Sequence, residues 1–124
     1  MRPKFRAWDK YNQKMFANDE LIIWNNNVYA NDSKKLSCNH LKGWSIDEEY
    51  LMQSTGFKDK NGKEIFEGDI LGTKNGLLNG VVEYRTDLGM WTNSLIRYNN
   101  FERLCNIAGD REILGNIYEN KELL

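Results

Sequence analysis

Glu67 and Asp69 place two carboxylates on either side of Gly68. On a strand, side chains two residues apart share a face, so such a pair could act in general acid–base catalysis. No nucleophile or histidine accompanies the pair, and the sequence has neither a Gly-x-Ser-x-Gly elbow nor a His-Glu-x-x-His motif. The pattern therefore favours a turn in which Asp69 accepts backbone N–H bonds, and we predict no catalytic residue.

The segment GFKDKNGKE at residues 56–64 invites comparison with ion-binding loops. A phosphate-binding Walker loop has four residues between its glycines, and then Lys and a hydroxyl-bearing residue. Here five residues intervene, and Glu64 replaces the hydroxyl and would repel phosphate. Counted from the aspartate of DKNG (residues 59–62), the glycine falls at position four, and position twelve is Ile70, whereas a calcium loop needs glycine at six and Glu at twelve. The segment predicts a tight turn, because Asn and Gly tolerate positive φ.

Metal and disulfide chemistry have few ligands to draw on. Cys38 and Cys105 do not make a secreted disulfide framework, and their spacing matches no zinc pattern. Cys38 and His40, the only histidine, could seed a metal site, but a second ligand pair is absent. We expect two reduced thiols, no metal and no cofactor.

Charge and hydropathy exclude several protein classes. The formal net charge is −1 and the pI is about 5.9, so the basic footprint of wholesale phosphate binding is missing, although a local basic patch stays open. The N-terminus lacks the apolar core of a signal peptide, and the longest apolar run, residues 21–24, is too short to span a membrane. These features predict a cytoplasmic protein with no membrane partner.

Aromatic residues carry the binding hypothesis. Four tryptophans and six tyrosines are many for a small domain, and small barrels use exposed rings with nearby Arg or Lys as binding platforms. The alternative is that the rings fill the core, since each buries a large area. We expect Trp8 and Trp91 to be partly exposed, because each opposes the more aliphatic face of its strand. The predicted binding surface comprises Arg6, Trp8, Lys74, Arg85, Trp91 and Arg97.

Short alternating segments separated by turn residues predict a mainly β fold. The strand candidates are residues 4–8, 14–17, 20–24, 28–30, 49–54, 70–73, 81–85, 90–98 and 112–118. Glycines at the corners allow the sharp bends that barrel closure requires. We expect an N-terminal antiparallel hairpin or meander over residues 1–48, packed on a small Src-homology-three-like barrel over residues 49–124, and the two could form one compact unit. The polar stretch at residues 31–43 reads as a loop and is the best candidate for the boundary between the modules.

One or two short helical turns complete the expected fold. Residues 47–49 could begin a short helix capped by Ser45, in place of the start of a strand. Residues 99–105 suit one turn of helix, and residues 119–124 a helical turn or a docked tail. In the turn at 99–105 we expect Asn100 as the cap and Phe101, Leu104 and Cys105 facing inward.

Three segments carry a family resemblance: KFRAWD at residues 4–9, LMQSTGFKDKNGKEIFEGDILG at 51–72 and ILGNIYENKELL at 113–124. In this order they resemble the YopX family of phage and prophage proteins. Phe57 and Phe66 stand where the family commonly has Leu and Tyr, and Lys121 where it commonly has Pro, which alters the rigidity of the tail. Residues 17–48 and 86–111 match nothing beyond pattern. The resemblance implies a phage-encoded, mainly β protein of the host bacterial cytoplasm with no established enzymatic activity, and it supplies no catalytic residues.

Three function classes remain. The leading hypothesis is a noncatalytic accessory protein that binds a protein or single-stranded nucleic acid through an aromatic-lined barrel face. The second is a self-assembling structural protein, a homo-oligomer paired through open strand edges near residues 20–30. The third is an enzyme acting on nucleotides or nucleic acids, built around Glu67 and Asp69.

Overall fold

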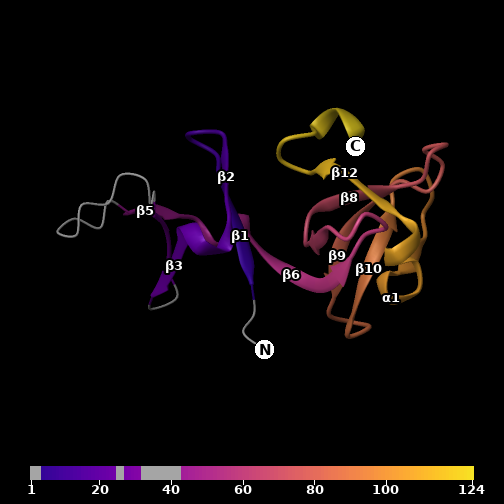
Figure 1. Cartoon of the computed structure of the whole chain (residues 1–124), viewed down its shortest axis with the longest axis horizontal. Coiled ribbons are helices and arrows are strands. Elements are labelled where there is room, and N and C mark those ends of the chain that lie inside the picture. The colour runs from indigo at the N-terminus through magenta and orange to yellow at the C-terminus, as the bar shows by residue number, and fades with distance from the viewer. Residues whose placement is uncertain (1–3, 25–26, 32–42) are drawn as a thin grey trace. The chain divides into compact units, whose positions relative to one another are not determined.

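The computed structural model of the chain describes residues 4–24, 27–31 and 43–124, and it confirms the mainly β class (Figure 1). The chain divides into two compact units, Met1–Gln53 and Ser54–Leu124. The predicted boundary between residues 48 and 49 precedes strand β6 (Leu51–Lys58), whereas the division lies inside that strand. Cys38 and His40, and most of the predicted loop at residues 31–43, lie outside the described residues.

The N-terminal unit contains two small antiparallel sheets. Its strands are β1 (Phe5–Asp9), β2 (Lys14–Phe16), β3 (Leu21–Trp24), β4 (Asn27–Asn31), β5 (Gly43–Ile46) and the first part of β6, with 3₁₀ turns η1 (Asn18–Glu20) and η2 (Glu48–Tyr50). β1 lies between β2 and β6, where Ala7 pairs with Phe16 on one side and Leu51 on the other. β4 lies between β3 and β5. Residues 47–54 contain both a helical turn and a strand, the two alternatives that the sequence left open, because η2 leads directly into β6.

The core of this unit is built around Ala7 and Phe16, with Leu21, Tyr50 and Leu51 packed against them. The prediction that Trp8 is partly exposed is wrong, because only 5% of it is accessible. Alternation along a strand exposes every second side chain only when one face meets solvent. In β1 the three consecutive residues from Ala7 to Asp9 are all buried, so both faces of its second half are covered.

The C-terminal unit contains a five-stranded antiparallel sheet, a half-barrel, in the order β11-β10-β9-β8-β12. Figure 1 labels β8, β9, β10 and β12 of this sheet. Its elements are the end of β6, β7 (Glu64–Phe66), β8 (Asp69–Gly72), β9 (Gly80–Arg85), β10 (Met90–Leu95), β11 (Phe101–Arg103), α1 (Leu104–Ile107), η3 (Ala108–Asp110), β12 (Glu112–Asn116) and η4 (Lys121–Leu123). All four residues of β8 are buried. The core cluster comprises Ile65, Leu71, Val82, Leu104 and Ala108.

The predicted helical turn at residues 99–105 is only partly correct. Phe101–Arg103 forms strand β11, and the helix begins at Leu104. Leu104 is buried as expected, whereas Cys105 is exposed. Cross-strand pairing explains the difference, because β10 pairs with residues 101–103 and draws them out of the helix. The extended segment that starts at Met90 accordingly ends at Leu95, before the turn that leads into β11.

One carboxylate holds the loop between β6 and β7. Asp59 is only 5% exposed, and its Oδ1 accepts N–H bonds from Asn61 and Lys63, each at 2.9 Å. Its Oδ2 accepts the N–H of Ile113 in β12 at 3.1 Å. The N–H of Gly62, which has φ 80°, donates to the carbonyl of Asp59 at 3.0 Å, so the predicted tight turn is confirmed.

A buried asparagine folds back the C-terminal segment. Asn116 Oδ1 accepts the N–H groups of Tyr118 at 3.0 Å and Glu119 at 2.9 Å. The N–H of Ile117 donates to the carbonyl of Gly68 at 2.9 Å, which ties this segment to the turn before β8. The predicted helical turn near the C-terminus is present as η4.

Candidate functional site

The sheet formed by β9, β10 and β11 presents two faces of different character. Val82 of the core cluster pairs with Asn93, which pairs with Glu102, so these three side chains share the core-facing side. Ser94 and Phe101 pair on the opposite side, which we call the hollow face. Neighbouring residues of one strand therefore lie on different faces of the sheet, one on the core-facing side and the next on the hollow face.

A polar hollow with a volume of about 310 Å³ opens at the hollow face. It is lined by Arg85, Ser94, Leu95, Tyr98, Asn99, Asn100 and Phe101. The turn between β10 and β11 forms its rim and is closed by a 3.0 Å bond from the Leu95 N–H to the Asn100 carbonyl. Asn100 Oδ1 also accepts the N–H of Phe101 at 2.8 Å, which fixes the start of β11. The rim is thus held by one backbone bond and one bond to a side chain, and it presents hydroxyl, amide and ring groups.

Arg85 is the charged group of the hollow, and its position is well defined. Its guanidinium carbon lies 5.0 Å from the centre of the Phe101 ring, within the range of a cation–π contact. Its Nε donates to Oδ1 of Asp87 at 3.0 Å, and its Nη2 donates to Oδ2 at 2.8 Å. These hydrogen bonds hold the pKa of Asp87 below its ordinary value and raise that of Arg85. The guanidinium is therefore oriented by two partners, and one carboxylate offsets its charge.

Two further predicted residues differ in their relation to the hollow. Arg97 is exposed in the turn that forms the rim, next to Tyr98, which is 50% exposed. Trp91 is partly exposed, as predicted, but it pairs with Tyr84 and packs against the core cluster, on the face opposite Arg85. The Trp91 and Tyr84 rings meet edge to face, with centres 5.2 Å apart and planes at 71°.

The remaining predicted binding residues lie elsewhere. Lys74 is exposed in the turn after β8, which a 3.0 Å bond from the Gly76 N–H to the Thr73 carbonyl closes. Arg6 and Trp8 belong to β1 of the N-terminal unit. Of the six, Arg85 lines the hollow and Arg97 lies in its rim. Sequence reasoning missed Tyr98, Asn99 and Phe101, and the only available signal was the polar, turn-forming run that they share with Asn100.

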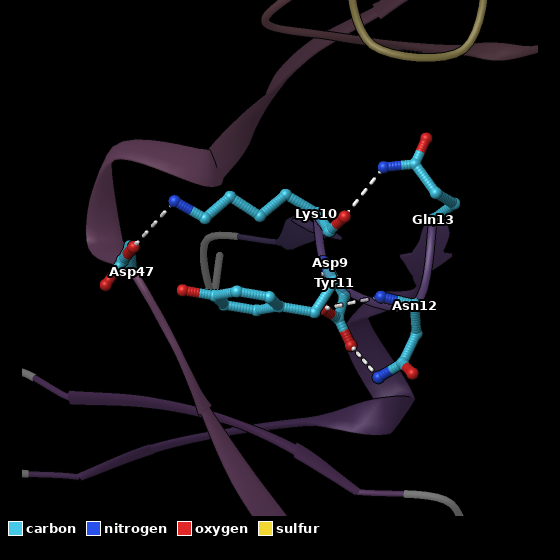
Figure 2. Close-up of polar contacts among 6 residues, drawn as sticks. All are labelled: Asp9, Lys10, Tyr11, Asn12, Gln13 and Asp47. Atoms are coloured by element: carbon cyan, nitrogen blue, oxygen red, sulfur yellow. Dashed lines mark hydrogen bonds and ion pairs between the residues drawn. The ribbon is translucent and has the colours of Figure 1, made fainter.

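A second surface cluster lies in the N-terminal unit, at the loop between β1 and β2 (Figure 2). The ammonium of Lys10 lies 5.2 Å from the ring centre of Tyr11 and 5.5 Å from that of Tyr50, and 3.9 Å from Oδ2 of Asp47. The two tyrosines, and then Asp47, raise the pKa of Lys10, although desolvation opposes them. Tyr11 is 83% exposed. The cluster presents a cation near two aromatic rings.

Buried Asp9 fixes the shape of this loop (Figure 2). Its Oδ1 accepts the N–H groups of Tyr11 at 3.0 Å and Asn12 at 3.3 Å, and its Oδ2 accepts the side-chain amide of Asn12 at 2.7 Å. Gln13 adopts a φ of 53° and donates from its side chain to the Lys10 carbonyl at 2.6 Å. The loop that the sequence predicts at residues 9–13 is thus an ordered Asx turn.

The carboxylate pair singled out in the sequence forms a turn. Asp69 is 2% exposed, and its Oδ2 accepts the N–H of Phe66 at 2.7 Å, which confirms its predicted structural role. Gly68, with φ 85°, reverses the chain between β7 and β8. Glu67 and Asp69 therefore do not lie on one strand, and the shared face that an acid–base pair would need is not formed.

The described part of the chain holds neither a metal-binding cluster nor a membrane-spanning helix. Over residues 4–24, 27–31 and 43–124, no cluster of three or more His, Cys, Asp or Glu side chains is arranged to hold a metal ion. Within the same part of the chain, no helix has the length and apolarity needed to cross a membrane.

Comparisons with known proteins cover nearly the whole chain. The model of a family described as "YopX protein" matches residues 4–124. The crystal structure of protein EF1440 from Enterococcus faecalis is similar over 100% of this chain and 99% of its own, with 29% sequence identity and a TM-score of 0.62. No curated protein matches the chain. Both matches extend over the residues of this chain that line the hollow.

Proposed function

We propose that this chain, which belongs to the YopX family, is a noncatalytic binding module of phage or prophage origin that recognises a protein partner in its polar hollow. It would act in the cytoplasm of the host bacterial cell. The observation that carries the proposal is the oriented Arg85 guanidinium, which lies over the Phe101 ring in a hollow whose rim bears the half-exposed Tyr98. Arginine and tyrosine are, with tryptophan, the residues enriched at the energetic centres of protein interfaces.

The composition of the hollow supports a protein partner. Its lining combines tyrosine, serine and asparagine side chains with one arginine, the mixture that antibody combining sites use for adaptable recognition. Rings supply contact area at a low entropic cost, and amides and hydroxyls supply hydrogen bonds. These groups bind a ligand without a proton transfer or a nucleophilic attack, in keeping with a noncatalytic role.

Charge argues against single-stranded nucleic acid as the main partner. The C-terminal unit, Ser54–Leu124, contains nine Lys and Arg residues against eleven Asp and Glu residues. Proteins that bind nucleic acids gain most of their affinity by neutralising phosphates with basic groups. The one arginine that lines the hollow already pairs with Asp87. A polyanion would therefore gain little there.

Site-specific photo-crosslinking tests the proposal. The full chain carries p-benzoyl-phenylalanine in place of Tyr98 and is expressed in cells that hold the native phage or prophage. The matched control carries it in place of Tyr84, a tyrosine of similar exposure (45% against 50%) on the other face of the sheet. We expect one protein partner to crosslink at position 98 and not at position 84, and to be lost with Arg85→Ala. Equal crosslinking at both positions, or crosslinking to nucleic acid alone, would contradict a protein-binding hollow.

Self-assembly is a second candidate, and the position of β3 favours it. Among the described residues β3 pairs with β4 on one side only, at the edge of its sheet. An open strand edge can pair with the same edge of a second copy. Multi-angle light scattering at millimolar protein is the test, and a strictly monomeric mass there would exclude self-assembly.

A further inference from the structure

We infer that the polar hollow takes an aromatic side chain of the protein partner, Tyr or Trp, which packs against the accessible part of the Arg85 guanidinium beside Phe101. This inference rests on the proposed function and adds to it the chemical group that is recognised. The Arg85 side chain lines the hollow and keeps 33% of its surface accessible.

The hydrogen-bonding edge of the guanidinium is largely occupied. Nε and Nη2 both donate to Asp87, so the edge that would normally clamp a carboxylate or phosphate already holds one. The guanidinium carbon lies over the Phe101 ring, 5.0 Å from its centre. The guanidinium also lines the hollow, and aromatic rings bind to guanidinium groups through their faces. A ring of the partner placed there would add a second aromatic contact to the one that Phe101 makes.

The charge of the pair selects against anions. Asp87 offsets the charge of Arg85 and itself remains 60% exposed beside the guanidinium. An incoming carboxylate or phosphate would meet a carboxylate at short range, which is unfavourable. A neutral ring meets no such repulsion. We therefore expect a neutral aromatic group to bind with weak dependence on salt.

Size and polarity narrow the choice of ring. A volume of about 310 Å³ lies at the lower limit of small-molecule sites, enough for one large side chain and its backbone. Ser94 and Asn99 supply a hydroxyl and an amide to the lining. Tyr and Trp carry a polar O–H or N–H that needs a partner when buried, whereas Phe does not. The polar lining thus favours Tyr or Trp.

The experiment is an NMR titration of the full chain with small probes. The probes are N-acetyl-tyrosinamide, N-acetyl-tryptophanamide, N-acetyl-leucinamide, N-acetyl-phosphotyrosinamide and uridine, each at millimolar concentration. We expect the two aromatic amides to shift the Arg85 Nε–H signal and the amide signals of Ser94 and Phe101, and the leucine and phosphotyrosine probes to bind more weakly. Arg85→Lys keeps the charge but loses the planar face, and should weaken tyrosinamide binding about fivefold.

Two variants make the result specific. Asp87→Asn removes the offsetting carboxylate, so phosphotyrosinamide should then bind at least as well as tyrosinamide. Arg103→Lys changes an exposed arginine of β11 that does not line the hollow, and should leave all titrations unchanged. Circular dichroism of each variant establishes that the fold is retained.

The outcomes separate this inference from the proposed function. Tighter binding of uridine than of tyrosinamide in the hollow would overturn the inference and point to nucleic acid. An absence of shifts with every aromatic probe would overturn it as well. If a protein partner still crosslinks at position 98 in that case, the hollow remains a protein-binding site with a different occupant. Loss of the crosslinked partner as well would remove the proposed function itself.

Discussion

Two arginine–carboxylate pairs lie on opposite faces of the same sheet and show how one interaction serves two purposes. On the core-facing side, Arg111 Nη2 donates to Oε2 of Glu102 at 2.6 Å, with side chains only 11% and 19% exposed. On the hollow face, Arg85 and Asp87 meet at 2.8 Å, with side chains 33% and 60% exposed. The bond lengths are similar, but the surroundings differ.

The difference in burial decides what each pair does. An exposed pair contributes little to stability, because water screens its attraction and the two side chains lose entropy. A buried pair has lost its hydration, so removal of one partner leaves an uncompensated charge in the interior. The inner pair therefore belongs to the stability of the half-barrel, while the pair in the hollow orients a guanidinium for binding.

The largest expected effect comes from breaking the inner pair. Glu102→Ala leaves Arg111 buried without its carboxylate, so we expect a loss of about 3 kcal/mol in the free energy of unfolding. Urea denaturation followed by circular dichroism measures it. The same measurement on Asp87→Ala gives the cost of breaking the exposed pair. If Glu102→Ala lost no more stability than Asp87→Ala, burial would not distinguish the two pairs.

The next effect concerns Asp59, which ties a turn to β12 through backbone bonds. Asp59→Asn should cost about 2 kcal/mol at pH 7, since an amide cannot accept all three N–H bonds with a charged oxygen. Burial alone would raise the pKa of Asp59, but the backbone N–H bonds outweigh it and the pKa lies below its ordinary value.

A carboxyl group with a lowered pKa in the folded state stabilises the protein above its unfolded pKa, about 3.9 for Asp. This contribution is lost as the pH falls through the folded value, because the unfolded chain binds the proton more readily. The stability difference between the wild type and Asp59→Asn should therefore be constant from pH 7 to about 5 and shrink below that. Urea titrations at each pH measure it, and a difference that grew in acid would contradict the role of Asp59.

A smaller effect is expected where the inner network meets the backbone. A Cβ added to Gly80 would lie 2.6 Å from Oδ1 of Asn93, which is fully buried and whose Nδ2 lies 3.4 Å from Glu102 Oε1. Gly80→Ala should therefore cost about 1–2 kcal/mol by displacing Asn93. In the double variant with Asn93→Ala the two costs should not add, and strict additivity would show that the two residues are not in contact.

The smallest effect is expected on the hollow face. Asp87→Ala should change the free energy of unfolding only slightly, because water screens this exposed pair, and the change should be smaller still in high salt. Its consequence lies in the hollow, where the guanidinium would lose its orientation. In Asp87→Ala we expect the Arg85 Nε–H signal to broaden or move while the stability stays nearly unchanged, which would support different roles for the two pairs. A large loss of stability in this variant would contradict that difference.

The sequence predicted best what short-range chemistry controls. The turn at Asp59–Gly62 and the acceptor role of Asp69 follow from residues within four positions of each other. Residues 101–103 read as helix, but they form a strand because β10 pairs with them, and that pairing is invisible in the local pattern. The burial of Trp8 has the same origin, since no local signal shows that both faces of a strand are covered.

The candidate site was only partly predictable for the same reason. Arg85 was expected in a binding surface, but the expectation joined it to Trp91, and the register of β9 and β10 puts the two on opposite faces. The aromatic partner of Arg85 is instead Phe101, sixteen positions along the chain. Which ring meets which cation depends on strand pairing, and a single sequence does not contain that information.

Strand β6 has a practical consequence for anyone who wishes to separate the two halves. Gln53 pairs with Phe5 and the next residue, Ser54, pairs with Phe66, so the chain passes from one unit to the other with no loop between them. Proteases cut where the backbone is exposed and unpaired. Limited digestion should therefore spare this junction. A fragment made by splitting the gene there would begin or end within strand β6, at a point where the strand is paired on both sides of the cut.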